Sequence, residues 1–369
     1  MQAIQATAKF ARKNTVMVIA FLAAAVTMFF VPIDEQYVGY FDAKTLVCLF
    51  CVLAVVCALR DVNFFYMLAG KLVERFKTIR SASIALVYIT FIGSMLIAND
   101  MALLTFLPLG FIVLKTTGFQ KYMAFVFIMQ NIAANLGGML TPFGNPQNLY
   151  LYSRFDIANL EFIKIMAAPF AFAVILITAC CFFIKPEPIK PVETELSVPK
   201  KKTAVLLLLF ALSIAIVFRG IPYIAGLIIP LALMFIDRKA LKNVDYPLLF
   251  TFVFFFIFAG NMARIEPIKE LLSSLLEKNT LLFSVISCQF ISNVPSAVLL
   301  SNFTVDYPSL LVGVNIGGVG TLISSLASLI TFREYTKNNP GKTAKYVALF
   351  SVLNFGFLIA LTAFSLAIV

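Results

Sequence analysis

Two segments of this chain, about 180 residues apart, carry residues that could coordinate an ion inside a membrane. The first reads Asn135-Leu-Gly-Gly-Met-Leu-Thr-Pro-Phe-Gly-Asn-Pro-Gln-Asn148, and the second reads Asn315-Ile-Gly-Gly-Val-Gly-Thr-Leu-Ile-Ser-Ser-Leu-Ala-Ser328. Gly and Pro interrupt helices, and the interruption exposes carbonyls that suit Na⁺ and amides that suit an anion. Two such breaks at corresponding places in two halves of a chain indicate a transporter's binding site.

A polar spot also interrupts the apolar stretch that precedes each break. In residues 81–115 it is Ala98-Asn99-Asp100, and in residues 280–303 it is Ser292-Asn293-Val294-Pro295. Each stretch could form two thin spanning helices or one re-entrant hairpin. In both cases the chain returns to the side that it left, so the expected topology is the same.

Asp100 is the one carboxylate deep in an apolar run. A charge there costs at least about 2.5–3.5 kcal/mol on insertion scales, and such residues are functional by default. Asp100 could bind Na⁺ as a carboxylate, or it could carry a proton. The alternative is that it caps a helix beginning at Met101, because Asp favours N-caps. Val294 takes the corresponding place in the second half, so a carboxylate site would be asymmetric.

We expect the two breaks and the two polar tips to form one substrate and ion site near the middle of the bilayer. Its candidate residues are Asn99, Asp100, Asn135, Gly137, Gly138, Thr141, Pro142, Gly144, Asn145, Asn148, Ser292, Asn293, Pro295, Asn315, Gly317, Gly318, Thr321, Ser324 and Ser325. Na⁺ would bind at Asn99, Asp100 and Asn293, and no other metal or cofactor is expected. The alternative role of the small residues is close packing of helices.

Composition identifies an integral membrane protein, for which membrane lipid is a partner. Of the 369 residues 61% are hydrophobic and 13% charged, and the mean hydropathy is +0.96, whereas a soluble domain is about half apolar and a quarter charged. The chain has no His, which excludes His-ligated metals and imidazole catalysis, so we do not expect an enzyme. The net charge of +11 lies in loops between apolar runs and indicates topology, not nucleic-acid binding.

Nine apolar segments are expected to span the membrane. They are residues 15–31, 44–59, 122–150 (interrupted), 162–184, 203–218, 221–236, 246–262, 309–332 (interrupted) and 344–368. Basic residues favour cytoplasmic loops, so Lys9, Arg12 and Lys13 place the N-terminus in the cytoplasm, and the acidic loop 32–44 lies outside. Nine crossings then place the C-terminus outside the cell (inner) membrane.

The chain divides into an N-terminal half, 1–184, and a C-terminal half, 203–369. A cytoplasmic linker, 185–202, joins them, and its Lys, Glu and Pro residues predict an extended, solvated connector. The first repeat covers about 44–184 and the second about 246–369. Both have the same order of parts: an apolar segment, an amphipathic stretch (62–76 and 266–277), a hairpin and a broken helix.

The two repeats have opposite orientations in the expected topology. Segment 44–59 runs from outside to inside, whereas its counterpart 246–262 runs from inside to outside. Inverted repeats around a midplane site are typical of secondary transporters. The expected fold class is therefore an all-α polytopic membrane protein with two inverted-topology repeats, each with a re-entrant hairpin and a broken transmembrane helix.

The remaining reactive residue types indicate structural roles. All six Cys lie in apolar runs, and Cys48-x-x-Cys51 lacks the βαβ context of a redox motif. We expect the thiols to pack in apolar surroundings. Arg60 and Arg264 align at a constant offset between the repeats and lie just beyond their apolar segments, where they would anchor the chain at the interface.

At these motifs the chain resembles the ion transporter superfamily, in particular its arsenite permease and sodium/proton antiporter branch and the related citrate-transporter-like permeases. Ile97-Ala-Asn-Asp100, followed by Leu104-Thr-Phe-Leu-Pro108, resembles the first hairpin of that branch. The segment from Asn135 to Asn148 resembles its Asn-x-Gly-Gly…Gly-(Asp/Asn)-Pro-x-Asn element. Ser292-Asn-Val-Pro295 and Asn315-Ile-Gly-Gly-Val-Gly-Thr321 resemble the counterparts in the second repeat.

The resemblance implies an elevator-type secondary transporter, often a homodimer, in which hairpins and broken helices carry substrate past a fixed scaffold. Carried onto this chain, it places substrate and coupling ion among Asn99, Asp100, Thr141, Asn145, Ser292, Asn293, Thr321 and Ser324. The chain departs from the sodium–dicarboxylate branch, because Asn99-Asp-Met and Asn293-Val-Pro stand where that branch has Ser-Asn-Thr. This departure argues against a two-sodium dicarboxylate mechanism.

We therefore expect a secondary transporter, coupled to H⁺ or Na⁺, for a small organic or inorganic anion such as a carboxylate or an oxyanion. Because of Asp100, a Na⁺/H⁺ antiporter or an arsenical exporter is the alternative. A passive channel is a remote alternative, since it would need a continuous polar lining or charged rings. Here polarity is confined to the middle of the apolar segments.

Overall fold

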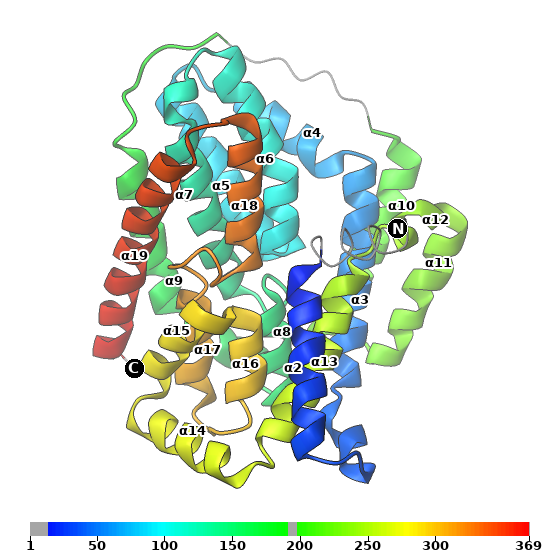
Figure 1. The fold of residues 1–369 in the computed structure, drawn as a ribbon. Helices are drawn as coiled ribbons and strands as arrows, with labels where there is room; N and C mark the ends of the chain where they lie inside the picture. The colour runs from blue at the N-terminus through cyan, green and yellow to red at the C-terminus, as the bar shows by residue number, and fades with distance from the viewer. Residues whose placement is uncertain (1–13, 191–197, 369) are drawn as a thin grey trace, which may run out of the picture.

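The computed structural model describes residues 14–190 and 198–368 (Figure 1). Across these residues every regular element is a helix, and an isolated β-bridge joins Thr78 to Pro188. Six helical stretches of the described chain are long and apolar enough to cross a membrane: Ala43–Asp61, Ile79–Ile97, Asn99–Thr116, Gln120–Leu140, Asn159–Cys181 and Thr343–Leu366. A seventh span would be the pair Tyr246–Met262 and Glu266–Lys278, which is bent by 98°. The expectation of an all-α polytopic membrane protein is confirmed.

The described part of the first half contains eight α-helices and three 3-10 helices. Its elements are α2 (Thr15–Phe30), η1 (Glu35–Tyr40), α3 (Ala43–Asp61), α4 (Phe64–Val73), α5 (Ile79–Ile97), α6 (Asn99–Thr116), η2 (Gln120–Tyr122), α7 (Met123–Gly137), η3 (Gly138–Leu140), α8 (Pro146–Arg154) and α9 (Asn159–Cys181). The basic residues Lys9, Arg12 and Lys13, on which the expected N-terminal orientation depends, lie outside the described residues.

The second half continues from the linker with helices only. Its elements are α10 (Lys200–Val217), η4 (Tyr223–Leu227), α11 (Ile228–Ile236), α12 (Arg238–Lys242), α13 (Tyr246–Met262), α14 (Glu266–Lys278), α15 (Thr280–Ile291), α16 (Asn293–Leu300), α17 (Tyr307–Ile316), α18 (Leu326–Asn338) and α19 (Thr343–Ile368). Helix α14 begins where the amphipathic stretch was expected, and α13 matches the predicted segment 246–262.

One group of helices forms around α3 and α13. Both helices begin at an aspartate cap: Asp42 Oδ1 accepts a bond from Thr45 N at 2.9 Å, and Asp245 Oδ1 accepts one from Leu248 N at 3.1 Å. Such caps satisfy amides that have no partner within the helix. Helix α3 packs against α10, α11 and α12, while α13 packs against α2 (Figure 1). We call α2, α3 and α10–α13 the scaffold group.

The second group contains the two hairpins and the two broken helices. Hairpin α5–α6 packs on α7, and hairpin α15–α16 packs on α17. The helices that follow the breaks cross over, because α8 packs against α16 of the other half and α18 packs against α6. In Figure 1 the α5–α6 hairpin lies in the upper part and α15–α16 in the lower part of the molecule. Helices α9 and α19 cover this central group.

The two hairpin tips have the same unusual backbone. Ala98 (φ 67°, ψ 152°) joins α5 to α6, and Ser292 (φ 75°, ψ 160°) joins α15 to α16. A side chain is strained in this region, which glycine favours, and such strain persists only where surrounding contacts enforce it. The arms differ in length: α5 and α6 have 19 and 18 residues, whereas α15 and α16 have 12 and 8.

The linker differs from the fully solvated connector that its composition predicts. Residues 200–202 already belong to α10, and residues 191–197 lie outside the described chain. At its start, Ile79 N donates to Glu187 O and Ile189 N donates to Lys77 O, each at 2.9 Å. These two backbone hydrogen bonds can form because Thr78, the N-cap of α5, has an extended backbone. They attach the start of the linker to α5 of the second group.

Candidate functional site

Both predicted helix breaks are present. In the first break, glycine allows the backbone segments on either side of the turn to approach each other closely. Helix α7 ends at Gly137, and Pro146 begins α8 after a 3-10 helix and a turn that the bond from Gly144 N to Thr141 O closes. A Cβ on Gly138 would lie 2.6 Å from Gly144 O and 2.4 Å from Asn145 Oδ1, so no larger residue fits. In the second half α17 ends at Ile316, and α18 begins only at Leu326.

Amide side chains join the two breaks across the centre of the molecule. Asn145 Nδ2 donates to Asn315 Oδ1 at 3.0 Å, and Ser325 Oγ donates to Asn135 Oδ1 at 2.7 Å. Asn145 and Ser325 occupy corresponding places, as do Asn135 and Asn315, so these two bonds form a matched pair. Asn315 Nδ2 also donates to Asn148 Oδ1 at 2.6 Å. These five side chains are buried.

The hairpin tips contact the breaks in matching ways. Asn99 N donates to Gly144 O at 3.1 Å, and Asn293 N donates to Ser324 O at 2.9 Å. Asn99 Nδ2 also donates to Asn135 Oδ1 at 3.2 Å. Each tip is therefore bonded to the turn just before α8 or α18, and this bond holds the strained residue in place.

One threonine bonds to the hairpin beside each tip. Thr141 Oγ1 donates to Met95 O at 2.8 Å, and Thr321 Oγ1 donates to Gln289 O at 3.1 Å. Met95 and Gln289 each stand three residues before their strained tip residue. Both threonines are half-buried, so they lie at the edge of the buried centre.

Gln289 bonds the backbone of the second break in a way that has no counterpart at the same position of the first half. Its Nε2 donates to Gly317 O at 2.9 Å and to Val319 O at 3.3 Å, while its Oε1 accepts from Thr321 N at 2.9 Å. Met95 takes the corresponding place in the first half and offers no such amide. The first break is instead bonded by Asn148 Nδ2, which donates to the carbonyl oxygens of Gly138, Met139 and Thr141.

Asp100 lies at the first tip, and the capping alternative is wrong. Helix α6 already begins at Asn99, with Ala98 as its N-cap, so Asp100 lies inside the first turn. Asn99 Oδ1 accepts a bond from Asp100 N at 2.9 Å. In the described chain Asp100 Oδ1 is buried without a hydrogen-bond partner, and so are Asn145 Oδ1 and Gln147 Oε1. An oxygen that is buried without a donor is an available ligand for a cation or a proton.

The structure also adds polar residues that the motifs did not indicate. Asn131 Nδ2 donates to Ser328 Oγ at 3.3 Å and to Asn354 Oδ1 at 3.4 Å, and Gln147 Nε2 donates to Asn315 Oδ1 at 3.4 Å. All of these side chains are buried. The sequence offered only one signal for these residues, namely an amide side chain within an apolar helix. Whether such a side chain points toward the centre depends on tertiary packing.

The remaining predicted residues have backbone or packing roles. A Cβ on Gly137 would lie 2.2 Å from Phe91 O, and one on Gly317 would lie 2.7 Å from Cys288 Cβ. Pro142 lies in the first break, and Pro295 is buried in the first turn of α16. Gly318 faces the centre, since its Cβ would lie 3.0 Å from Asn293 Nδ2. Ser292 Oγ donates to Ser324 O at 3.2 Å.

Cys288 packs beside Gly317 of the second break. The described residues contain no cluster of His, Cys, Asp and Glu that could hold a metal. Cys48, Cys51, Cys57, Cys181 and Cys288 are buried and Cys180 is half-buried, all as free thiols. The expectation that the cysteines pack in apolar surroundings is thus confirmed. Arg60 lies beside the first tip, with its guanidinium 3.7 Å from Met101 Sδ and 3.9 Å from Cys57 Sγ.

Comparisons with known proteins give a family of transporters and two relatives, of which one is named a transporter and the other an inner membrane protein. A family model described as "Citrate transporter" matches residues 6–309. An uncharacterized transporter of Methanocaldococcus jannaschii is 32% identical over 326 residues, which cover 87% of this chain and 89% of that protein. The inner membrane protein YbiR of Escherichia coli is 31% identical over 318 residues, which cover 83% of each chain.

Proposed function

The chain belongs to the citrate transporter family, and on that premise we propose that it is an ion-coupled secondary transporter of citrate or a similar small carboxylate anion. Family membership and the transporter named among its relatives support secondary transport. The substrate, the coupling ion and the mechanism are our proposals.

The observation that carries the proposal is the matched pair of bonds between the two breaks. Asn145 to Asn315 and Ser325 to Asn135 join backbone that is unwound in the middle of an apolar protein. Irregular backbone survives at membrane depth only where protein covers it or a polar cavity meets it. A carrier needs such a site, because helix ends and amides replace the water around its substrate.

We further propose that the two halves are inverted repeats and that the protein works as an elevator. The matching tips at Ala98 and Ser292, and the matching threonine bonds of Thr141 and Thr321, support a common ancestral unit. In this mechanism the hairpins and broken helices move together against the scaffold group. The cytoplasmic N-terminus, the outside C-terminus, the cell-membrane location and a homodimeric assembly belong to the same proposal.

The coupling ion in this proposal is Na⁺ or H⁺ at the first tip. Asp100 Oδ1 and Asn145 Oδ1 are buried oxygens without donors, on two elements that the Asn99 N to Gly144 O bond holds together. Oxygen ligands suit Na⁺, and a carboxyl group can carry a proton instead. The second tip has Val294 in place of a carboxylate, so one coupling site with a carboxylate is expected.

Uptake of radiolabelled citrate into proteoliposomes tests the proposal, with Na⁺ and proton gradients imposed separately. We expect uptake that depends on one of these gradients and falls strongly in Asn145→Ala and Asn315→Ala. Asn338→Ala is a matched control, because Asn338 bonds only to Glu334 of its own helix. Gradient-driven Na⁺, H⁺ or arsenite flux without citrate uptake would refute the carboxylate substrate and favour the cation antiporter or arsenical exporter, which Asp100 makes the second candidate.

A further inference from the structure

A cavity of about 520 Å³ lies apart from the central site, where the scaffold group meets the ends of α8 and α16. Its walls come from η1 and the start of α3, from the last turns of α13, and from the ends of α8 and α16. Two of the elements that form it, α8 and α16, begin at the central site and end at this cavity. Helices α8 and α16 therefore connect the central site to the cavity.

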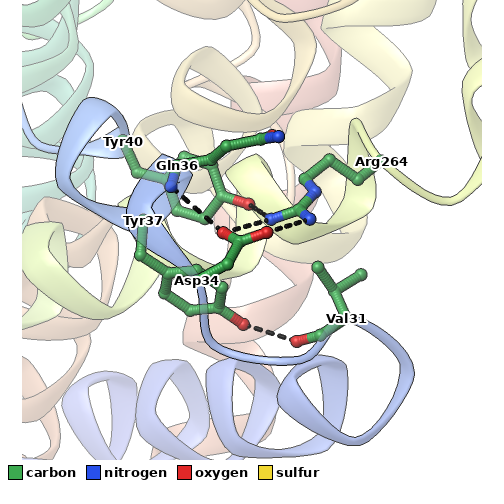
Figure 2. A network of polar contacts seen from close by, with 6 residues as sticks. All are labelled: Val31, Asp34, Gln36, Tyr37, Tyr40 and Arg264. Carbon is green, nitrogen blue, oxygen red and sulfur yellow. Dashed lines mark hydrogen bonds and ion pairs between the residues drawn. The ribbon is translucent and has the colours of Figure 1, made fainter.

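The wall on the side of α13 is built around Arg264 (Figure 2). The guanidinium donates to Asp34 at 2.6 and 3.0 Å and to Tyr40 Oη at 3.0 Å. Tyr37 Oη fixes the same turn by donating to Val31 O at 2.6 Å. The ion pair with Asp34 neutralises the charge of Arg264 and fixes its position. Arg264 is therefore a structural part of the cavity lining and adds little positive charge to it.

Two other cations at the cavity have no such neutralising partner. Lys44 forms no ion pair with any described residue, and Arg154 makes only a 3.5 Å hydrogen bond to the neutral Asn302 Oδ1. The one acidic side chain that lines the cavity, Asp42, is committed to capping α3 through Thr45 N and Thr45 Oγ1. Asp42 keeps its negative charge, but Lys44 and Arg154 together outnumber it, so the cavity lining retains a net positive charge.

Tyr150 and its contacts form the part of the cavity lining nearest to the central site, which we call the floor. Tyr150 Oη is bonded to Ser301 Oγ at 2.9 Å, and the Tyr150 ring packs against Phe256 at 5.6 Å between centroids. Tyr150 follows Asn148 of the central site by two residues on α8. With a rise of about 1.5 Å per residue, Tyr150 lies only about half a turn beyond Asn148 along α8, so the cavity and the central site are neighbours along this helix.

We propose that this cavity is a second, separate docking site for a small polycarboxylate anion, held by Lys44 and Arg154. Arg and Lys donors in a recess attract carboxylates and concentrate them, and Arg can bind a carboxylate through two parallel bonds. The choice of a polycarboxylate rests on the proposed function, whereas the position of the site rests on the cavity and its charges.

An introduced tryptophan gives a direct test, because the chain contains no Trp. Phe41 lines the cavity and is 38% exposed, so Phe41→Trp in the full-length protein in detergent supplies a single local fluorophore. We expect citrate to change its fluorescence saturably and the uncharged trimethyl ester of citrate to have no effect. In the double variant Lys44→Gln/Arg154→Gln the apparent Kd should rise at least about tenfold, since two charge-assisted bonds are lost.

A variant of the central site separates the two binding events. With Asn145→Ala added to Phe41→Trp, the apparent Kd from the fluorescence titration should be unchanged, because Asn145 belongs to the central site and does not line the cavity. No titration, a titration unaffected by Lys44→Gln/Arg154→Gln, or one abolished by Asn145→Ala would each overturn the docking site. A normal titration together with no citrate uptake in proteoliposomes would refute the proposed function and leave the docking site standing.

Discussion

Replacing Ala98 by glycine should stabilise the protein, although glycine normally destabilises an apolar helical hairpin. Ala98 has φ 67° and ψ 152°, a conformation that essentially only glycine adopts freely. A non-glycine residue there costs about 1–3 kcal/mol, whereas glycine costs roughly 0.4–1 kcal/mol through the greater freedom of the unfolded chain. The net effect of Ala98→Gly is therefore a stabilisation of up to about 2.5 kcal/mol.

The same chemical change four residues later should have the opposite sign. Ala102 is fully buried within α6, where its backbone is helical. Glycine within a helix costs about 1 kcal/mol relative to alanine, and the lost methyl contact adds to this. Ala98→Gly and Ala102→Gly should thus differ by more than about 1 kcal/mol in stability, with Ala98→Gly the more stable.

Thermal unfolding in detergent, followed with a thiol-reactive dye, measures this difference. Five of the six cysteines are buried and become reactive when the protein unfolds, and neither substitution touches them. We expect the midpoint of Ala98→Gly to lie at or above that of the wild type and the midpoint of Ala102→Gly to lie below it. If Ala98→Gly lowered the midpoint as far as Ala102→Gly, the tip would not be strained and our reasoning would be refuted.

Three further predictions concern coupling, packing and pH. Asp100→Asn should abolish the dependence of citrate uptake on an imposed ion gradient while the protein stays folded, because a neutral amide neither carries a proton nor balances a cation; wild-type gradient dependence in proteoliposomes would contradict this. Gly137→Ala should strongly reduce the yield of monodisperse protein, since the added Cβ would lie 2.2 Å from Phe91 O, whereas Gly356→Ala, with nothing within 4 Å, should match the wild type. The hydrogen bond from Arg264 lowers the pKa of Asp34, so the stability that this pair adds is present above the ordinary value of 3.8 and is lost as the pH falls through the lowered pKa. The difference in unfolding midpoint between the wild type and Arg264→Gln should therefore be constant near neutral pH and shrink only below that value, and a loss of the difference already near neutral pH would contradict the assignment.

Much of the fold follows from local sequence. Apolar runs predict the long helices, and Gly and Pro predict where α7 and α17 end, because an interrupted backbone cannot continue the helix. The break before Pro146 and the tip at Asn99 were readable in the same way. The short helix α12 and the 3-10 helix η1 were not predicted, since neither has an apolar run of its own.

The pairing of the site residues depends on packing that no local pattern encodes. Asn131 and Asn354 are single amides in apolar helices, and they meet only because α19 covers α7. Helix α8 packs against α16 and α17 of the other half, and Asn315 lies on α17. The motifs could therefore predict that Asn145 and Asn315 share a site, but not that they bond to each other. Gln289 was missed because its role depends on carbonyls of a distant break.

The exchange of helices between the two halves has a consequence for biogenesis. Helix α8 leaves the ribosome long before α16, its packing partner, has been synthesised, and α6 must wait for α18 near the end of the chain. The N-terminal half should therefore insert into the bilayer with its polar break still uncovered, and it would depend on lipid, water or a membrane chaperone until translation is nearly complete. Two halves produced as separate polypeptides in one cell should recover function only by assembling with each other.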